Sequence, residues 1–334
     1  MSELRIPVFA DVEAAAERIA GVAIETPLLE NPLLNEDLGA RILIKPENLQ
    51  RVGAFKFRGA YNRLVQFNGQ ERARGIVAFS SGNHAQGVAA AAQLLGIEAT
   101  IVMPSDAPEM KVWNTRGYGA NVVLYDRVTE SREEIAAKIT REKGSVVVPP
   151  FEDPDIIAGQ GTAALEMLRQ AHRIGAVFDA FLCPAGGGGL ASGCSIVFGE
   201  LSPNTALYAV EPAGFDDLVR SLQSGHREVN EQLTGSVCDA LLTPSTGDLT
   251  FSILGNSLDG GFSVTDEEAL GAVKYAWQKL KLVVEPGGAV GLAALLYGKL
   301  DVKGKTIGLL LSGGNVDEST FVKALSGGLP PVNF

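Results

Sequence analysis

The sequence has few cysteines and no long apolar run, and each shortage excludes a class of protein. Its cysteines, Cys183, Cys194 and Cys238, are too few and too scattered among 334 residues for a disulfide framework, and no cysteine or histidine pair has zinc-finger spacing. No segment offers the roughly 18 apolar residues of a membrane span, and the acid-containing N-terminus lacks the apolar core of a signal peptide. We therefore expect a soluble protein of the reducing cytoplasm, with no membrane partner.

Basic residues are also in short supply. The 28 lysines and arginines face 39 aspartates and glutamates, so the formal net charge is −11. Phosphate backbones would repel such a chain, and we expect no nucleic-acid partner. The 46% hydrophobic and 20% charged residues are typical of a globular protein. At roughly 150 residues per domain, the length suggests two domains.

Apolar runs typical of strands alternate with helical patterns along almost the whole chain. Examples of the strand-like runs are "RILIKP", "ATIVMP" and "TIGLLLSGG", and a helical one is "GTAALEMLRQAHRIG". This alternation predicts an α/β fold of βαβ units, with parallel sheets covered by helices on both faces. No repeat or long linker marks a boundary. A second domain is therefore expected as an insertion in the first, with the prolines of "VVVPPFEDPD" at the return point.

One lysine stands between aromatic residues, because Lys56 of "GAFKFRG" lies between Phe55 and Phe57. A partly desolvated lysine has a lowered pKa and can act as an amine nucleophile or base. The same alternation also fits a half-buried strand or the start of an amphipathic helix. This segment alone leaves both interpretations open.

Three glycine-rich turns follow strand-like runs, and ligands of open α/β sheets bind beyond the carboxyl ends of strands. In "SSGNHAQG", Ser80, Ser81 and Asn83 precede a helix whose first N–H groups favour an anion, although ordinary capping uses the same residue types. In "PAGGGG", Gly186–Gly189 allow backbone amides to approach a phosphate, against the alternative of a flexible turn. In "SGGN", Ser312 suits a heteroaromatic ring edge, but read alone this segment is only a turn.

The segment "YAVEPAGFDD" brings carboxylates to the end of another strand. Glu211, Asp216 and Asp217 form an oxygen-rich group suited to a hard divalent cation. The ordinary alternative is a solvated acidic loop, which the residues by themselves favour.

A lysine, a phosphate cradle, an anion-binding helix start and a ring-edge hydroxyl together suggest pyridoxal phosphate, whose aldehyde, phosphate and pyridine nitrogen each need a partner. The chain resembles the fold-type II pyridoxal phosphate enzymes, in the branch of serine/threonine dehydratases, serine racemases and 3-hydroxyaspartate dehydratases. The motifs "GAFKFRGAYN", "SSGNHAQG", "AGQGT", "PAGGGG", "EPGGA" and "SGGN" occur in the family's order.

This resemblance implies a fold and a set of cofactor contacts. The fold is tryptophan synthase β-like, with two open, twisted, mainly parallel sheets flanked by helices. Residues 1–70 and 149–334 are expected to form a large cofactor domain, and residues 71–148 a small mobile one. Lys56 is implied as the catalytic Schiff-base residue, with Phe55 beside the ring. The other implied cofactor contacts are Asn83 at the phenolic oxygen, Gly186, Gly187, Gly188 and Gly189 at the phosphate, Glu285 of "EPGGA", and Ser312 at the pyridine nitrogen.

The resemblance also implies substrate contacts. Ser81 stands where threonine deaminases commonly have alanine, and it could act as a catalytic acid or base on the face opposite Lys56. Arg132 resembles a racemase arginine able to meet a distal carboxylate, although pairing with Glu133 or Glu134 on a helix surface explains it equally well. The implied substrate-binding residues are Ser80, Ser81, Asn83, His84 and Arg132. A hydrogen-bonded loop histidine is an equal alternative for His84.

The acidic loop resembles the divalent-ion site of the racemase and hydroxyaspartate dehydratase branch. The implied ligands of Mg²⁺ or Ca²⁺ are the side chains of Glu211 and Asp217 and the carbonyl of Phe215. Related enzymes are commonly homodimers or homotetramers, and the same is expected of this chain.

The implied activity is β-elimination from small L-β-hydroxy amino acids, namely threonine, serine or 3-hydroxyaspartate, to give a 2-oxo acid and ammonia. A neutral hydroxyl at the pyridine nitrogen disfavours a long-lived carbanion and so favours prompt loss of the β-substituent. The close alternative is a serine racemase with side dehydratase activity. The remote alternative is a non-catalytic ligand-binding module, which would have no need of Lys56.

Overall fold

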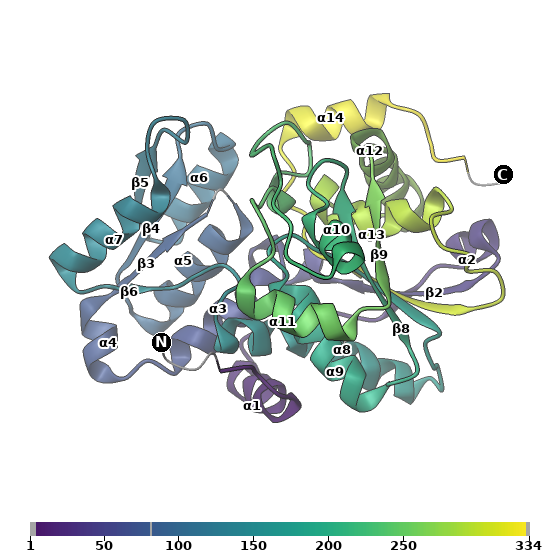
Figure 1. Ribbon diagram of the computed structural model, residues 1–334, viewed down its shortest axis with the longest axis horizontal. Coiled ribbons are helices and arrows are strands. Elements are labelled where there is room, and N and C mark those ends of the chain that lie inside the picture. Colours follow the sequence, from purple (N-terminus) through teal and green to yellow (C-terminus); the bar gives the residue numbers. More distant parts are fainter. Residues whose placement is uncertain (1–4, 81, 332–334) are drawn as a thin grey trace.

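The computed structural model describes residues 5–80 and 82–331, and over this part of the chain it contains two separate sheets (Figure 1). The larger sheet has the strand order β1-β2-β10-β7-β8-β9. Its neighbouring strands are parallel except for β1 and β2, which are antiparallel. The bounds are β1 Leu29–Glu30, β2 Arg41–Pro46, β7 Ala180–Pro184, β8 Ala206–Pro212, β9 Gly260–Val264 and β10 Thr306–Leu311.

Alternate residues of the larger sheet enter two different cores. Ile42 and Ile44 of β2 pack with helices α12 and α13, whereas Leu43 packs with α1, α8 and α9 on the opposite face. Because both faces are buried, most residues of the inner strands are apolar, as the sequence predicted, with Lys45 of β2 and Glu211 of β8 as buried exceptions. The helices of the two faces are α1 Phe9–Ile19, α8 Pro154–Arg173, α9 Gly189–Leu201, α12 Asp266–Tyr275 and α13 Pro286–Leu296.

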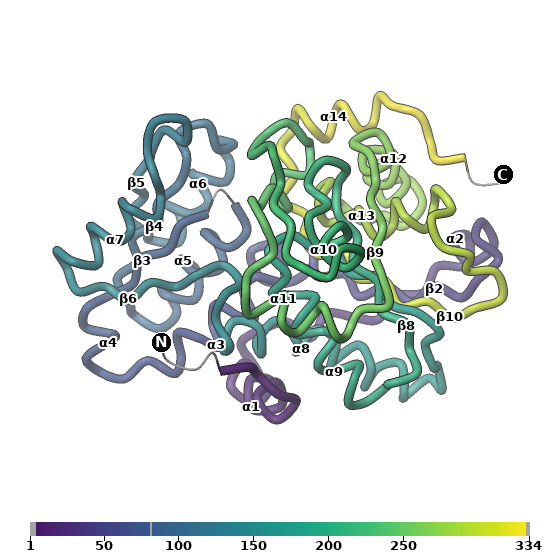
Figure 2. The backbone as a smooth tube through the Cα atoms, in the orientation of Figure 1, coloured from purple at the N-terminus to yellow at the C-terminus, as the bar shows by residue number. Residues whose placement is uncertain are grey.

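The smaller sheet is parallel throughout and has the order β5-β4-β3-β6. Helices α3 and α5 pack on one face and α7 on the other. Figure 2 shows this part of the chain, from α4 to α7, on the left of the view, with the elements from α8 to α14 on the right. The bounds are β3 Ile76–Phe79, β4 Ala99–Pro104, β5 Asn121–Tyr125, β6 Val146–Val147, α3 Lys56–Val65, α4 Gly69–Arg74, α5 Asn83–Leu95, α6 Glu109–Gly117 and α7 Arg132–Lys143.

Helix α3 packs closely against α8 at a crossing of glycines. A Cβ atom on Gly159 would lie 2.6 Å from the Cα of Gly59, so neither backbone tolerates a side chain there. The remaining elements are α2 Pro32–Leu38, α10 Asp217–Ser224, α11 Asp248–Ser257, α14 Glu318–Ser326, three short 3₁₀-helices at Glu47–Leu49, Arg51–Gly53 and Asp239–Leu241, and a π-helical turn at Ala276–Leu280.

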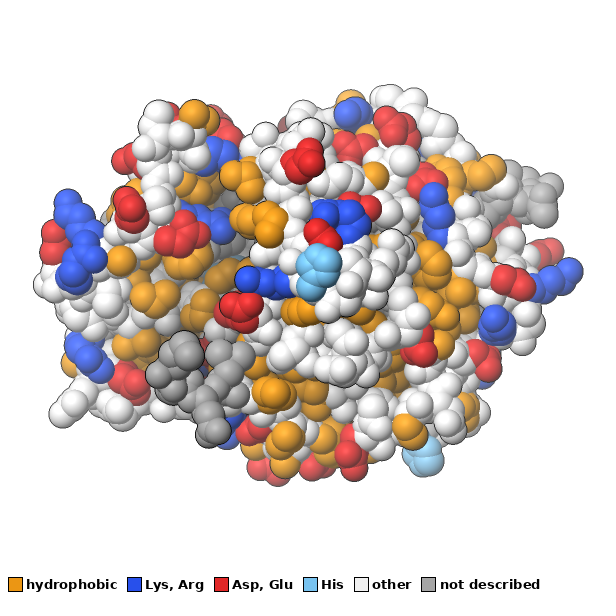
Figure 3. Space-filling model, viewed as in Figure 1, with side chains coloured by type: hydrophobic (Ala, Val, Ile, Leu, Met, Phe, Trp, Pro, Cys, Tyr) orange, Lys and Arg blue, Asp and Glu red, His pale blue; other side chains and the backbone are white. Residues whose placement is uncertain are grey.

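The predicted architecture of two mainly parallel sheets flanked by helices is confirmed. The strands of the smaller sheet all lie between residues 76 and 147. The domain limits of 1–70, 71–148 and 149–334, and the mobility of the small domain, remain predictions. Within the described residues, no helix is both long and apolar enough to cross a membrane. Acidic and basic side chains are interspersed on the face drawn in Figure 3.

Candidate active site

Most of the predicted site residues line one cavity between the two sheets. They reach it because "SSGNHAQG", "PAGGGG" and "SGGN" follow the carboxyl ends of the parallel strands β3, β7 and β10. The predicted residues that line the cavity are Phe55, Lys56, Ser80, Asn83, His84, Arg132, Gly186, Gly187, Gly188, Gly189 and Ser312. Ser81, the predicted acid or base, lies outside the described residues.

Lys56 is the first residue of α3, and its Nζ donates a hydrogen bond to the carbonyl of Pro150 at 2.8 Å. The same Nζ lies 5.3 Å from the centroid of the Phe55 ring. No salt bridge to Lys56 occurs within the described part of the chain, and desolvation lowers its pKa to about 8. A substantial fraction of this amine is therefore free to act as a nucleophile or base near neutral pH.

His84 lies beside Lys56 at the start of α5 and is neutral. Burial, together with the charge of Lys56, lowers the pKa of its imidazole to about 3. Its Nε2 is 3.1 Å from the carbonyl oxygen of Val148, which can only accept, so we assign the ring proton to Nε2. The buried Nδ1 has no partner among the described residues. His84 can thus accept a hydrogen bond, but it cannot serve as an acid at neutral pH.

The four glycines form a cradle between β7 and α9. A Cβ on Gly187 would lie 2.2 Å from the ring of Phe151, and Gly188 has the left-handed φ of 88° that glycine tolerates best. Thr250 holds the loop by donating its Oγ1 hydrogen to the carbonyl of Gly187 at 2.7 Å. Because α9 begins at Gly189, its first N–H groups are available to an anion. The cradle therefore fits a phosphate group.

Ser312 and Asn83 lie at two other walls of the cavity. The carbonyl of Ser312 accepts from the backbone N–H of Phe55 at 3.1 Å, which ties the end of β10 to the residue before Lys56. Asn83 accepts from Asn315 at 2.8 Å through Oδ1, and its Nδ2 donates to the carboxylate of Glu285. Glu285 does not line this cavity, so its contact lies behind Asn83.

Arg132, the first residue of α7, lies in the cavity wall with its guanidinium carbon 5.3 Å from the centre of the Phe79 ring. Its Nε donates to Glu133 at 2.8 Å, and its side chain is 34% exposed. Both sequence interpretations of Arg132 are thus compatible with its position. It pairs with a helix neighbour, and it also faces the site.

The match to known proteins identifies the family. Residues 19–313 match the family described as "Pyridoxal-phosphate dependent enzyme". This chain is a pyridoxal-phosphate dependent enzyme. It is 42% identical over 322 residues to an L-threo-3-hydroxyaspartate ammonia-lyase of Saccharomyces cerevisiae, covering 96% of this chain and 97% of that protein. It is 41% identical to a serine racemase of Schizosaccharomyces pombe, covering 97% of this chain and 98% of that protein. The crystal structure of the T.th. threonine deaminase superimposes with a TM-score of 0.88 at 45% identity, over 93% of this chain and 99% of that chain.

The predicted metal ligands of this pyridoxal-phosphate dependent enzyme do not line the reaction cavity; Glu211 lies near the end of β8, and Asp217 is the first residue of α10. Glu211 is fully buried and accepts from the backbone N–H groups of Leu218 and Val219 at 3.4 and 2.8 Å. Asp217 accepts from Thr246 and Asn230, and no salt bridge reaches either carboxylate among the described residues. The described residues contain no cluster of three metal-ligating side chains.

Sequence reasoning missed several residues around the site. Phe151 closes the glycine cradle, and Asp239 lines the cavity. The buried Lys111 of α6 lies 2.6 Å from Asp239 and 3.7 Å from Glu285, so it links the elements around both sheets. Lys111 and Asp239 are 128 residues apart, and no pattern in the sequence connects them. Phe151 lies in "VVVPPFEDPD", the segment whose prolines led us to expect the return point of the chain there.

Proposed function

We propose that this enzyme catalyses β-elimination from small L-β-hydroxy amino acids, giving a 2-oxo acid and ammonia. The observation that carries the proposal is the desolvated amine of Lys56 in one cavity with a glycine cradle and an anion-binding helix start. The similarity to an ammonia-lyase at 42% identity supports the same reaction class. Membership of an enzyme family argues against the non-catalytic binding module.

The residues of the cavity suit pyridoxal phosphate. When bound, this cofactor supplies an aldehyde for the substrate amine and a ring that withdraws electrons from Cα. We assign Gly186–Gly189 to its phosphate, Ser312 to its pyridine nitrogen and Asn83 to its phenolic oxygen, with Phe55 beside the ring. Glu285 acts on the cofactor through the Asn83 amide, to which its carboxylate is bonded.

Lys56 has the central role in this proposal. It would hold the cofactor through Nζ in the resting enzyme, and once the substrate amine has displaced it, the freed Nζ would take the α-proton of the substrate. The β-hydroxyl leaves with a proton as water, and the released enamine hydrolyses to the 2-oxo acid and ammonia. The lowered pKa supports this role, because only the unprotonated amine can take a proton.

The substrate carboxylate is assigned to the start of α5, where Ser80, Asn83 and His84 line the cavity at the helix N-terminus. Ser81, which lies outside the described residues, is proposed as a further contact. Among the candidate substrates, 3-hydroxyaspartate carries a second carboxylate. Arg132 supports that substrate, since it lines the cavity and, among the described residues, only its Nε has a hydrogen-bond partner, Glu133. Threonine and serine offer no such group.

The testing experiment compares two substrates at equal concentration with the purified, cofactor-loaded enzyme. Release of 2-oxo acid is measured from L-threonine and from L-threo-3-hydroxyaspartate. Preference for hydroxyaspartate supports Arg132 as a specificity residue, and preference for threonine assigns Arg132 to the helix surface. Release from neither substrate would falsify the proposed activity.

Serine racemisation is the second candidate, supported by the 41% identity to a serine racemase. It requires a proton to be returned to the substrate face opposite Lys56, a role assigned to Ser81. Incubation with L-serine in deuterated water separates the two activities, because racemisation gives deuterated D-serine and elimination gives pyruvate. Absence of D-serine dismisses the racemase.

A divalent cation, Mg²⁺ or Ca²⁺, is proposed at Glu211, Asp217 and the carbonyl of Phe215. Two buried carboxylates side by side, with no basic partner among the described residues, support this site. We also propose a cytoplasmic location, which the three buried free thiols suit, and assembly as a homodimer or homotetramer.

A further inference from the structure

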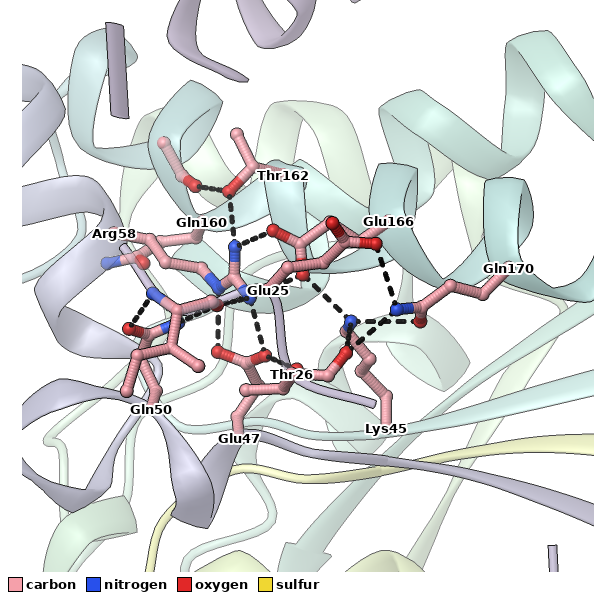
Figure 4. Close-up of polar contacts among 12 residues, drawn as sticks. Glu25, Thr26, Lys45, Glu47, Gln50, Arg58, Gln160, Thr162, Glu166 and Gln170 are labelled. Atoms are coloured by element: carbon pink, nitrogen blue, oxygen red, sulfur yellow. Dashed lines mark hydrogen bonds and ion pairs between the residues drawn. The ribbon is translucent and has the colours of Figure 1, made fainter. Parts of the chain in front are cut away.

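On the other side of α3 from the reaction cavity lies a buried group of charged side chains, here called the ion cluster: Lys45, Glu47, Arg58 and Glu166 (Figure 4). Arg58 lies between Glu47, which follows β2, and Glu166 of α8. Lys45 of β2 also contacts Glu166, at 2.8 Å. Two cations and two carboxylates give a net charge of zero, so each buried charge has a partner.

Arg58 is held on both sides by paired hydrogen bonds. Its Nε and Nη2 donate to the two oxygens of Glu47 at 2.7 and 2.8 Å. Its Nη1 and Nη2 donate to the two oxygens of Glu166 at 2.6 and 2.7 Å. The side chain is 0% exposed. A planar guanidinium held between two carboxylates fixes both the direction and the rotation of the side chain that carries it.

Arg58 and Lys56 belong to the same first turn of α3. At about 100° per residue, side chains two positions apart point to roughly opposite sides of a helix. Lys56 reaches the carbonyl of Pro150, just before α8, while Arg58 reaches Glu166 within α8. At the next residue, the backbone N–H of Gly59 donates to the Gln160 side chain of α8 at 3.1 Å. Rotation or sliding of this turn would therefore break bonds to Arg58 and move Lys56 at once.

We infer that Arg58 is a positioning residue, whose paired bonds to Glu47 and Glu166 hold the first turn of α3 so that Lys56 points into the reaction cavity. The kinetic part of this inference rests on the proposed function. The alternative is that the ion cluster serves stability only. The two can be separated, because removal of a whole buried ion pair is often tolerated by a fold, whereas removal of one partner is not.

The experiment uses two charge-balanced double variants. Arg58→Met/Glu47→Gln removes the pair nearest Lys56 and keeps Lys45 with Glu166. The matched control Arg63→Met/Asp153→Asn removes another ion pair, at 2.8 Å, between α3 and the residue that caps α8, and it leaves every bond of Arg58 in place. For each protein, far-UV circular dichroism and Tm report the fold. Visible circular dichroism of bound pyridoxal phosphate and the pH dependence of its attachment rate to the apo-protein report the placement and pKa of Lys56.

The Arg58 variant is expected to remain folded, with a weakened circular dichroism signal of the bound cofactor. The midpoint pH of the cofactor attachment rate should rise by about one unit or more. Its kcat should fall about 100-fold, because misplacement by about 1 Å costs that much, with little change in KM. The control should stay within about fivefold of wild type in kcat. Equal defects in both variants, or wild-type cofactor signals in a folded Arg58 variant, overturn the inference.

Arg58→Lys provides a second route if the double variant does not fold. It keeps the charge but not the planar fork, so the same loss of cofactor dichroism is expected. Wild-type behaviour of Arg58→Lys would show that charge alone suffices and would overturn positioning. If the proposed function is wrong, the wild-type enzyme releases no 2-oxo acid. The cofactor signals of the variants can still be compared, so the positioning role of Arg58 is tested separately.

Discussion

Lys56 and Arg58 are two basic residues of one helical turn, but their surroundings shift their pKa values in opposite directions. Desolvation lowers the pKa of Lys56 to about 8, because no carboxylate pairs with it among the described residues. Arg58 is also desolvated, but the charges and hydrogen bonds of Glu47 and Glu166 outweigh that effect and raise its pKa. Lys56 thus presents to the cavity an amine that can lose its charge, whereas Arg58 places a permanent cation in the interior.

This difference decides which residue can do chemistry. With a pKa of about 8, about one Lys56 amine in ten is neutral at pH 7, against about one in 2,500 for an ordinary lysine. Arg58 stays charged at every accessible pH and can only hold and orient. The contrast therefore depends on where carboxylates are absent as much as on where they are present.

The largest effect is expected from removal of the reactive amine. Lys56→Ala should lower 2-oxo acid release by at least about 1,000-fold, because both the covalent cofactor attachment and the proton acceptor are lost. The variant should still bind pyridoxal phosphate non-covalently through the glycine cradle. Absorption spectra before and after borohydride reduction test the attachment, and retention of a reducible bond together with turnover would refute the assignment of Lys56.

A smaller effect is expected at Arg132, which has a partner outside the cavity and a face inside it. Arg132→Gln should lower kcat/KM for L-threo-3-hydroxyaspartate about 10- to 100-fold, the value of one charge-assisted hydrogen bond. Activity toward L-threonine should change little. Arg127→Gln is the control, because Arg127 pairs with Asp106 and does not line the cavity. Equal losses with both substrates would rule out recognition of a distal carboxylate.

A carboxylate placed beside Lys56 should raise the pKa of its amine, and so remove the difference in pKa shift between Lys56 and Arg58. In wild type, the attachment rate of pyridoxal phosphate to the apo-protein should rise with pH through about 8, because only the neutral amine attacks. His84→Glu should shift this midpoint upward by about one unit, a tenfold loss at neutral pH, since an adjacent negative charge favours the protonated amine. His84→Gln keeps a neutral donor for Val148 and is the control. An unshifted midpoint in His84→Glu would show that residue 84 does not act on the charge of Lys56.

Much of the fold could be predicted from the sequence, because it depends on local patterns. Apolar runs such as "RILIKP" predict strands that are buried on both faces, and β2 is one. The glycines of "PAGGGG" predict a turn between strand and helix, and it joins β7 to α9. Gly186–Gly189 and Ser312 follow the neighbouring parallel strands β7 and β10, so their meeting at one edge of the larger sheet followed as well. Ser80 follows β3 of the smaller sheet, and it reaches the same cavity only through the packing of the two sheets.

The ion cluster and the Lys111 contacts could not be predicted in the same way. Arg58 and Glu166 are 108 residues apart, and Lys111 and Asp239 are 128 apart. In the sequence each of these charged residues has an apolar neighbour, as Asp239 does in "VCDAL" and Glu166 in "ALEML", and nothing in those segments identifies its partner. Periodicity indicates which face of an element is apolar, but it does not indicate which charges meet when two sheets and their helices pack together.

The smallest effect is expected from removal of the proposed cation. Its site consists of carboxylates without a basic partner among the described residues, as Lys56 is an amine without an acidic one. Glu47 and Glu166 share two buried cations, whereas Glu211 and Asp217 have no basic partner among the described residues. A divalent cation would pair with Glu211 and Asp217 as Arg58 pairs with Glu47 and Glu166. Chelation should lower Tm by a few degrees, about 1 kcal/mol or more of lost ligand stabilisation, and added Mg²⁺ or Ca²⁺ should restore it. In Glu211→Gln/Asp217→Asn, chelation should have no effect on Tm, and an unchanged Tm in wild type would argue that these carboxylates are held by their hydrogen bonds alone.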